Sequence, residues 1–98
     1  MSTTRILVVD DEYGVRSGIR QILELEGYEV DEAATGEEAL ALFEKNRYAV
    51  ALLDYRLPDM DGLTVLAAIK KSGRETMTCM ITAYANIESA HDEGNDLS

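Results

Sequence analysis

Three short apolar runs constrain the fold of this chain more than any other feature. They cover residues 5–9, 48–53 and 77–81, and each is too short for an ordinary helix. Apolar side chains fall on both faces of the first and last run, which is typical of parallel strands covered on both sides. A fourth strand is predicted over residues 28–33, where glutamate and aspartate alternate with apolar residues. Charge of this kind favours a position at the edge of a sheet.

The segments between these strands have the periodicity of helices. One helix is predicted to end at Gly27, a second to run from a capping box at Thr35 and Glu38 to about Lys45, and a third to run from Asp61 to Ser72-Gly73. The first has its apolar residues at helical spacing, namely Val15, Ile19, Ile22, Leu23 and Leu25. The second is expected to bury Ala39, Leu40 and Phe43, and the third to pack through Leu63, Val65, Leu66 and Ile69. A fourth helix is predicted from Asn86, with Ile87 and Ala90 facing inward.

This regular alternation predicts the α/β class, with a parallel sheet and helices on both faces. Right-handed crossovers restrict the topology to few possibilities. The chain has 98 residues, which is enough for one small domain and one core. We expect the domain to occupy residues 1–90, followed by a polar, acidic tail over residues 91–98.

The charge of the chain bears on its partners. Nineteen acidic and nine basic residues give a formal net charge of −10, which argues against a nucleic-acid surface. Acidity suits a divalent cation, although a merely solvated acidic surface is the more common explanation. Cys79 is the only cysteine, so no internal disulfide forms, and we expect it to be a small buried hydrophobic residue.

The sequence also bears on location. No apolar run approaches the roughly 20 residues of a membrane span. The first five residues are too few and too polar for a signal peptide. A cytoplasmic protein without membrane contact is therefore expected.

Polar side chains follow three of the predicted strands. Asp10 and Asp11 follow the first strand, Asp54 the third and Thr82 the fourth. The carboxyl ends of parallel strands share one edge of the sheet, where ligands bind in open α/β folds. Three carboxylates held together need a proton or a cation to offset their charge, and Mg²⁺ fits oxygen ligands of this kind. A carboxylate beside such an ion can act as a nucleophile and form an aspartyl-phosphate. The Thr82 hydroxyl could then donate to a phosphoryl oxygen.

Simpler explanations exist for each residue taken alone. Asp10 and Asp11 could serve only the start of the next helix, because acidic groups favour that end of its dipole. Asp59 and Asp61 are expected to be turn and cap residues, and Thr82 could have no role. The conjunction of all three strand ends favours a site.

Three segments together resemble the receiver domain of two-component response regulators. They are residues 6–12 (Ile-Leu-Val-Val-Asp-Asp-Glu), 52–62 (Leu-Leu-Asp-Tyr-Arg-Leu-Pro-Asp-Met-Asp-Gly) and 80–84 (Met-Ile-Thr-Ala-Tyr). The resemblance extends from about Thr4 to Ala90. It implies a flavodoxin-like fold with strand order 2-1-3-4, and a phosphoryl group accepted by Asp54 from a sensor histidine kinase.

The resemblance also implies roles for the neighbouring residues. Asp11, Asp54 and the backbone carbonyl of Arg56 would hold Mg²⁺, and Asp10 would act mainly through water. Thr82 would carry the switch. The side chains of Arg56 and Tyr84 would tune the lifetime of the phosphoryl group.

The sequence departs from the family in its last part. Receiver domains have a fifth strand that ends in lysine and a fifth helix, and neither follows here. Lys70 and Lys71 belong to the third predicted helix and cannot replace that lysine. We therefore expect a (βα)₄ remnant of a (βα)₅ fold, with impaired output. The edge of the strand at residues 77–81 would be exposed, which favours a homo-oligomer.

Two other functions stay open from the sequence. One is a structural or dimerisation module that keeps the fold without signalling. The other is a phosphohydrolase, an enzyme that usually needs a general acid two positions after the nucleophile. Arg56 holds that position here and cannot serve, so we expect the chain not to be an enzyme.

Overall fold

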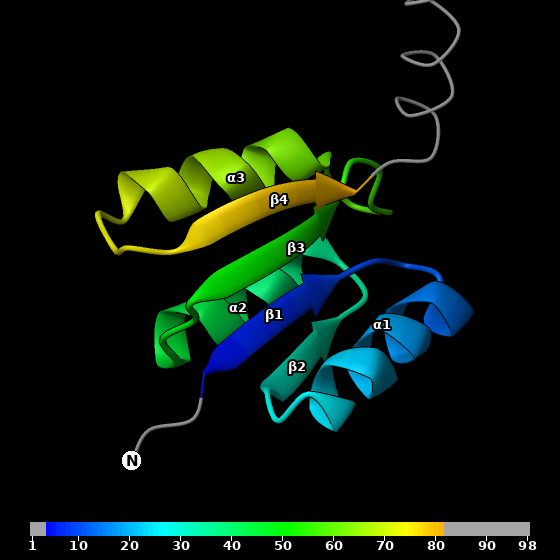
Figure 1. Ribbon diagram of the computed structural model, residues 1–98. Coiled ribbons are helices and arrows are strands. Elements are labelled where there is room, and N and C mark those ends of the chain that lie inside the picture. Colours follow the sequence, from blue (N-terminus) through cyan, green and yellow to red (C-terminus); the bar gives the residue numbers. More distant parts are fainter. Residues whose placement is uncertain (1–3, 82–98) are drawn as a thin grey trace, which may run out of the picture.

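The computed structural model describes residues 4–81, in which strands and helices alternate (Figure 1). The elements are β1 (Arg5–Val9), α1 (Tyr13–Leu25), β2 (Glu29–Ala33), α2 (Gly36–Lys45), β3 (Val50–Asp54), α3 (Gly62–Lys71) and β4 (Met77–Ile81). The strand at 77–81 and the end of α2 lie where the sequence predicts them. The predicted helix from Asn86 lies outside the described residues.

The four strands form one parallel sheet in the order β2-β1-β3-β4, which confirms the predicted fold and strand order. β1 is central, with Ile6 between Val30 of β2 and Val50 of β3. β3 begins at Val50 rather than Tyr48 and includes Asp54 as its last residue, opposite Ile81 of β4. All strands therefore end at the same edge of the sheet.

The two faces of the sheet are covered unequally. α2 and α3 lie together on one face, while α1 lies on the other, over β1 and β2 (Figure 1). The core fills the space between the sheet, α2 and α3, where each fully buried large aliphatic or aromatic side chain contributes about 1.5–3 kcal/mol. Its members are Leu7, Val9, Ala33, Ala39, Phe43, Tyr48, Ala51, Leu53, Val65 and Ile69.

The apolar sides of α1 and α3 are covered only in part. In α1, Ile19 and Leu23 are half-buried, but Val15, Ile22 and Leu25 are 40%, 64% and 87% exposed. The helical spacing of these residues is confirmed, but the last three do not pack against the sheet. The reason is that α1 lies over one side of the sheet, with no second helix beside it on that face within residues 4–81. In α3, Leu63 is likewise 47% exposed.

The expectation that Cys79 is buried is also wrong. Cys79 is exposed and Met77 is 72% exposed, whereas Thr78 and Met80 are half-buried. Successive strand residues point to opposite faces of a sheet. Thr78 and Met80 therefore face the side that α3 covers. Cys79 faces the side that α1 leaves open.

The edge strand β2 differs from β4 in its charge. Glu29 makes an ion pair with Arg5 at 2.9 Å, and Glu32 makes one with Arg16 of α1 at 2.8 Å. Asp31 accepts a hydrogen bond from the hydroxyl of Tyr48 at 2.6 Å. The predicted edge strand is thus an acidic edge tied to its neighbours. No helix within residues 4–81 is long and apolar enough to cross a lipid bilayer.

Candidate functional site

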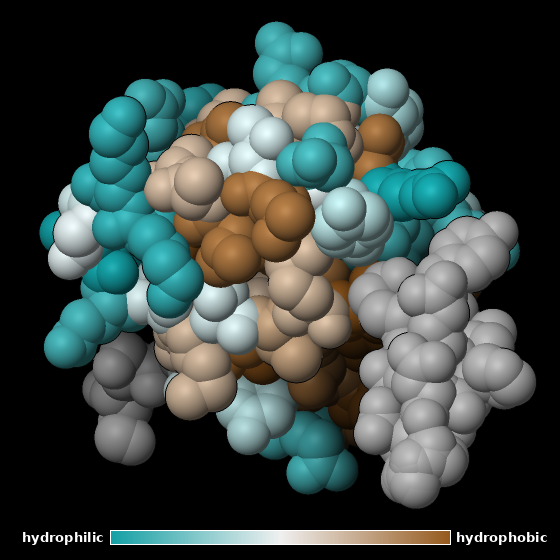
Figure 2. Space-filling view, turned by 90° about the horizontal axis from the view of Figure 1, so that it is seen from above, coloured by the Kyte–Doolittle hydropathy of each residue, from teal (hydrophilic) through white to brown (hydrophobic). Residues whose placement is uncertain are grey.

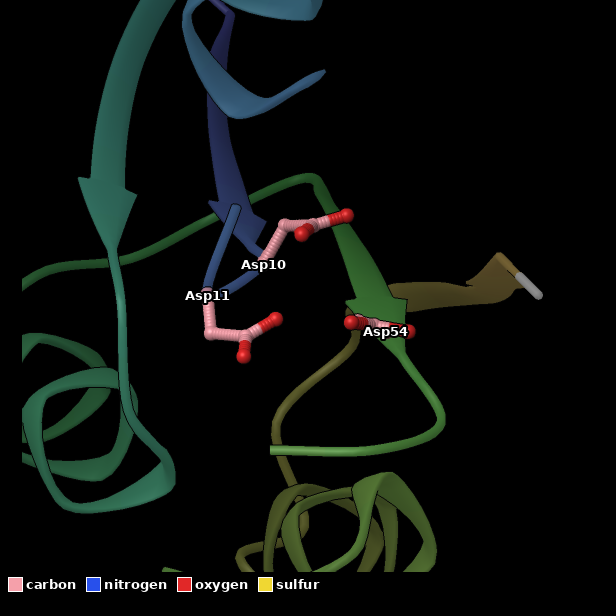
Figure 3. Close-up of side chains that lie close together, drawn as sticks. All are labelled: Asp10, Asp11 and Asp54. Atoms are coloured by element: carbon pink, nitrogen blue, oxygen red, sulfur yellow. The ribbon is translucent and has the colours of Figure 1, made fainter. Parts of the chain in front are cut away.

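Three aspartates meet at the carboxyl edge of the sheet (Figure 3). Asp10 and Asp11 follow β1, and Asp54 ends β3. Because Val9 and Leu53 are register partners in adjacent parallel strands, the residues that follow them come together. One carboxylate oxygen from each aspartate lies within 4.8 Å of the others. The predicted cluster is therefore present.

Asp10 is the buried member of the cluster, with 6% of its surface exposed. One of its carboxylate oxygens accepts a hydrogen bond from the backbone N–H of Glu12 at 2.9 Å. Its backbone carbonyl accepts one from the guanidinium of Arg16 at 2.8 Å. These contacts fix both the side chain and the strand end from which it projects.

Helix capping does not account for the acidic residues that precede α1. The N-cap is Glu12, and its side chain makes no capping hydrogen bond. The first turn of α1 contains no acidic residue. Asp11 is exposed and Asp54 is half-buried, so both carboxylates can be reached from solvent.

The electrostatics of the cluster concentrate on Asp54. Partial burial raises the pKa of its carboxyl group, and the charges of Asp10 and Asp11 raise it further. A backbone hydrogen bond from the N–H of Arg56, with a long N···O distance of 3.4 Å, opposes this shift. The site thus favours either a proton on Asp54 or a bound cation, which would relieve the same repulsion.

The loop between β3 and α3 is folded tightly against the end of β3. The N–H of Gly62 donates to the carbonyl of Tyr55 at 2.6 Å, and the N–H of Leu57 donates to the carbonyl of Met60 at 3.1 Å. A Cβ atom on Gly62 would overlap the carbonyl oxygen of Asp54, so only glycine fits there. The loop thereby keeps the Arg56 backbone beside Asp54.

Asp61 is the N-cap of α3, as predicted. Its carboxylate accepts hydrogen bonds from the backbone N–H and the hydroxyl of Thr64, both at 2.9 Å. Thr35 caps α2 in the same way, accepting from the N–H of Glu38 at 3.0 Å. Glu38 differs from an ideal capping box, because its side chain accepts from Ala34 at 2.8 Å.

Asp59 has a structural contact that the sequence does not reveal. Its two carboxylate oxygens accept from the N–H groups of Gly36 and Glu37 at 2.8 and 2.9 Å. The Gly36 hydrogen bond is the main reason that the pKa of Asp59 is lowered. These bonds join the loop after Asp54 to the first turn of α2. No local motif indicates the contact, because its partners lie more than twenty residues earlier in the chain.

The remaining predicted site residues fall elsewhere. Thr82 and Tyr84 lie outside the described residues. Lys70 and Lys71 are in the last turn of α3. The first residue of this helix, Gly62, lies beside Asp54. They therefore lie at the far end of that helix from the cluster, in agreement with the prediction that they cannot serve it.

Comparisons with known proteins agree with this geometry. The family model described as the response regulator receiver domain matches residues 6–94. Sporulation initiation phosphotransferase F of Bacillus subtilis is 35% identical over 88 residues, which is 90% of this chain and 71% of that protein. Transcriptional regulatory protein SrrA of Staphylococcus aureus is 41% identical over 81 residues. That match covers 83% of this chain but only 33% of SrrA.

Solved structures give the same result. A CheY-like response regulator receiver domain protein from Methanospirillum hungatei superposes with a TM-score of 0.83 at 41% identity, covering 96% of this chain and 75% of that one. Response regulator TrrA of Thermotoga maritima, in complex with Mg²⁺ and BeF, has a TM-score of 0.81 at 40% identity. That match covers 89% of this chain and 76% of TrrA.

Proposed function

The chain belongs to the response regulator receiver domain family, and on that basis we propose that Asp54 accepts a phosphoryl group from a sensor histidine kinase. The observation that carries this proposal is the position of Asp54. It ends a central strand beside two further carboxylates, within 4.8 Å of both. Half-burial leaves it open to an incoming phosphoryl donor.

We propose Mg²⁺ as the cation of this site. Carboxylate oxygens are the hard ligands that Mg²⁺ prefers, and the ion would neutralise both the carboxylates and the phosphoryl oxygens. Asp11, Asp54 and the backbone carbonyl of Arg56 would be the direct ligands. Asp10 already accepts a hydrogen bond from Glu12, which supports a role through water rather than as a direct ligand.

In the transfer itself, an oxygen of Asp54 attacks the phosphorus of a phosphohistidine. A bond from oxygen to phosphorus forms, the bond from phosphorus to the imidazole nitrogen breaks, and the imidazole leaves with the electron pair. Asp54 has to be ionised for this attack, whereas burial and the charges of Asp10 and Asp11 raise its pKa. A cation held by the three carboxylates would offset both effects and keep Asp54 ionised.

We also propose that Thr82 is the switch hydroxyl. It follows Ile81, which is the register partner of Asp54.

The proposed domain spans residues 1–90, with residues 91–98 as an acidic tail. We propose a cytoplasmic location, a histidine kinase as phosphoryl donor, self-association through the β4 edge, and no nucleic-acid or membrane partner for this domain. The domain would act as a signalling module rather than as an enzyme.

The test is phosphorylation by a small-molecule donor. The chain is incubated with acetyl phosphate and Mg²⁺, and intact-mass spectrometry measures the addition of one phosphoryl group. Wild type is expected to gain the group and Asp54→Asn to gain none. Glu75→Gln is the matched control, because it removes one exposed carboxylate outside the site. Equal responses of wild type and Asp54→Asn would favour the non-signalling alternative.

A further inference from the structure

The loop that follows β3 is a closed piece of backbone. Two backbone hydrogen bonds hold it closed, one between Tyr55 and Gly62 and one between Leu57 and Met60. Between these bonds, Arg56 and Asp61 lie opposite each other as an antiparallel pair. The loop is therefore expected to move as one piece, with residues 58–59 at its tip.

The antiparallel pair connects the loop to the site. A pair that lies between two such bonds is a non-hydrogen-bonded pair, so the backbone groups of Arg56 face away from Asp61. The N–H of Arg56 accordingly lies 3.4 Å from a carboxylate oxygen of Asp54. The position of the Arg56 backbone beside Asp54 thus depends on the orientation of the whole loop.

The tip of the loop is held against the start of α2 by two contacts. The carboxylate of Asp59 accepts from the N–H groups of Gly36 and Glu37 at 2.8 and 2.9 Å, distances typical of charge-assisted hydrogen bonds. The positive end of the helix dipole favours a carboxylate at this place. The side chain of Met60 lies so close to Gly36 that a Cβ atom there would overlap it. The tip therefore has one polar and one apolar contact with α2.

α2 relies on Asp59 for these hydrogen bonds. The first N–H groups of a helix have no acceptor within the helix itself. The hydroxyl of Thr35 accepts from the N–H of Glu38, and the carbonyl of Thr35 accepts from that of Ala39. The acceptor for the first two amides of α2 comes from the loop that also carries Arg56. The start of α2 and the loop at the site thus share one set of bonds.

The other end of the loop is attached to α3. Asp61 caps this helix by accepting from Thr64. The first turn of α3 is partly open, because Leu63 is 47% exposed. Figure 2, which looks onto α3 and β4, shows hydrophobic side chains at the surface on this side of the molecule. These contacts fix where the loop ends, and the contacts with α2 are left to orient its tip.

We propose that Asp59 is a positioning residue for the metal site. Its bonds to α2 hold the loop in the orientation that keeps the carbonyl of Arg56 beside Asp54, where the two can bind one cation. Asp59 is not a ligand itself, because both of its carboxylate oxygens accept from α2. The inference rests on the proposed Mg²⁺ site. Because coupling between two sites is reciprocal, binding of Mg²⁺ should stabilise the bonds at the start of α2 as much as those bonds strengthen binding.

The first test is hydrogen exchange of the full 98-residue chain in EDTA, followed by NMR. Asp59→Ala should speed the exchange of the Leu57 and Gly62 amides, whose bonds close the loop. Thr35→Ala is the matched control, because it removes another cap from the same turn of α2 and leaves the bonds of Asp59 in place. It should not speed exchange in the loop. Asp59→Asn keeps one acceptor oxygen and should show a smaller effect of the same kind as Asp59→Ala, and circular dichroism checks that each variant is folded.

The second test is titration with Mg²⁺, followed by calorimetry and by amide chemical shifts. Asp59→Ala should raise the dissociation constant about tenfold, the lower end of what is usual when a group that orients a metal ligand is removed. Thr35→Ala should bind as wild type does. Glu37→Gln, which removes an exposed carboxylate from the same turn, should do so too and controls for charge. In wild type the amide signal of Gly36 should shift together with those of the site, and in Asp59→Ala it should not respond.

The outcomes separate this proposal from the proposed function. Unchanged exchange at Leu57 and Gly62 in Asp59→Ala would overturn it, whether or not the chain binds Mg²⁺. A dissociation constant that Thr35→Ala raises as much as Asp59→Ala does would also overturn it, because the effect would then come from the stability of α2. A wild-type chain that binds no Mg²⁺ would refute the proposed cation, and the exchange data in EDTA would still decide whether Asp59 holds the loop.

Discussion

Replacement of Asp54 by asparagine should stabilise the metal-free protein. The structure places a carboxylate oxygen of Asp54 within 4.8 Å of oxygens from Asp10 and Asp11. Asparagine has nearly the same shape and keeps an oxygen that can accept from the N–H of Arg56. The substitution therefore removes two repulsive interactions while leaving the local packing in place.

The size of the effect follows from Coulomb's law. Two unit charges 4.8 Å apart repel by about 0.9 kcal/mol in water and about 3.5 kcal/mol at an effective dielectric constant near 20. Asp11 is exposed and Asp54 is half-buried, so the lower value applies to their pair. Asp10 is 6% exposed, so its repulsion of Asp54 is at least as large. The two pairs together give a gain of about 2 kcal/mol or more in the free energy of unfolding. For a chain of this size, each kcal/mol raises the melting temperature by about 4–8 °C.

The pH dependence of this gain has a definite sign. The pKa of Asp54 is raised in the folded state, so the folded protein binds the proton more tightly than the unfolded chain does. The wild-type protein therefore loses stability as the pH rises from the unfolded pKa through the raised folded pKa. Asp54→Asn lacks this loss. Its advantage should be absent below that window, grow across it and stay constant near neutral pH.

The assay is thermal or urea unfolding in EDTA at low ionic strength. Glu75→Gln makes the same change in net charge at an exposed position outside the cluster and is expected to have little effect. The reasoning is refuted if Asp54→Asn is no more stable than wild type near neutral pH. A gain of equal size in Glu75→Gln would refute it as well, because the effect would then come from net charge and not from the cluster.

Three further predictions follow from the same structure. Mg²⁺ at a hundred times its dissociation constant should stabilise wild type by about 2.7 kcal/mol; thermal shifts should show a smaller effect in Asp54→Asn and Asp11→Asn. Asp59→Ala should lower the melting temperature, because α2 loses the acceptor for the N–H groups of its first turn. The pKa of Asp59 is lowered, so its contribution is present above the unfolded pKa and lost as the pH falls through the folded pKa; the variant and wild type should then converge in acid. Gly62→Ala should lower the free energy of unfolding by about 1–3 kcal/mol and weaken Mg²⁺ binding, because its Cβ would overlap the Asp54 carbonyl. Its control is Gly18→Ala in α1, where a Cβ meets nothing within 4 Å. That variant should raise the free energy of unfolding by at most about 1 kcal/mol.

The sequence predicts well those parts of the site that lie at strand ends. Asp10, Asp11 and Asp54 directly follow or end apolar runs, and parallel pairing brings such ends together whatever the details of packing. The contact of Asp59 with α2 could not be predicted in this way. It depends on how the loop after β3 lies against a helix from an earlier part of the chain.

Exposure was harder to predict than secondary structure. The 3.6-residue spacing of Val15 and Ile22 predicts the helix correctly, and the apolar run around Cys79 predicts the strand correctly. Periodicity shows which side of an element is apolar, but not whether another element lies against that side. For these residues the answer depends on the unequal covering of the two faces of the sheet, which only the three-dimensional arrangement reveals.

The charges of β2 also have a consequence for foreign peptides. Glu29 and Asp31 both pair with Arg5, and Glu32 pairs with Arg16, so the carboxylates along this strand are held in place. An extended peptide that added to β2 would have to lie against this fixed row of negative charge. This side of the sheet is therefore closed to strand addition by charge, without any helix or loop of residues 4–81 covering it.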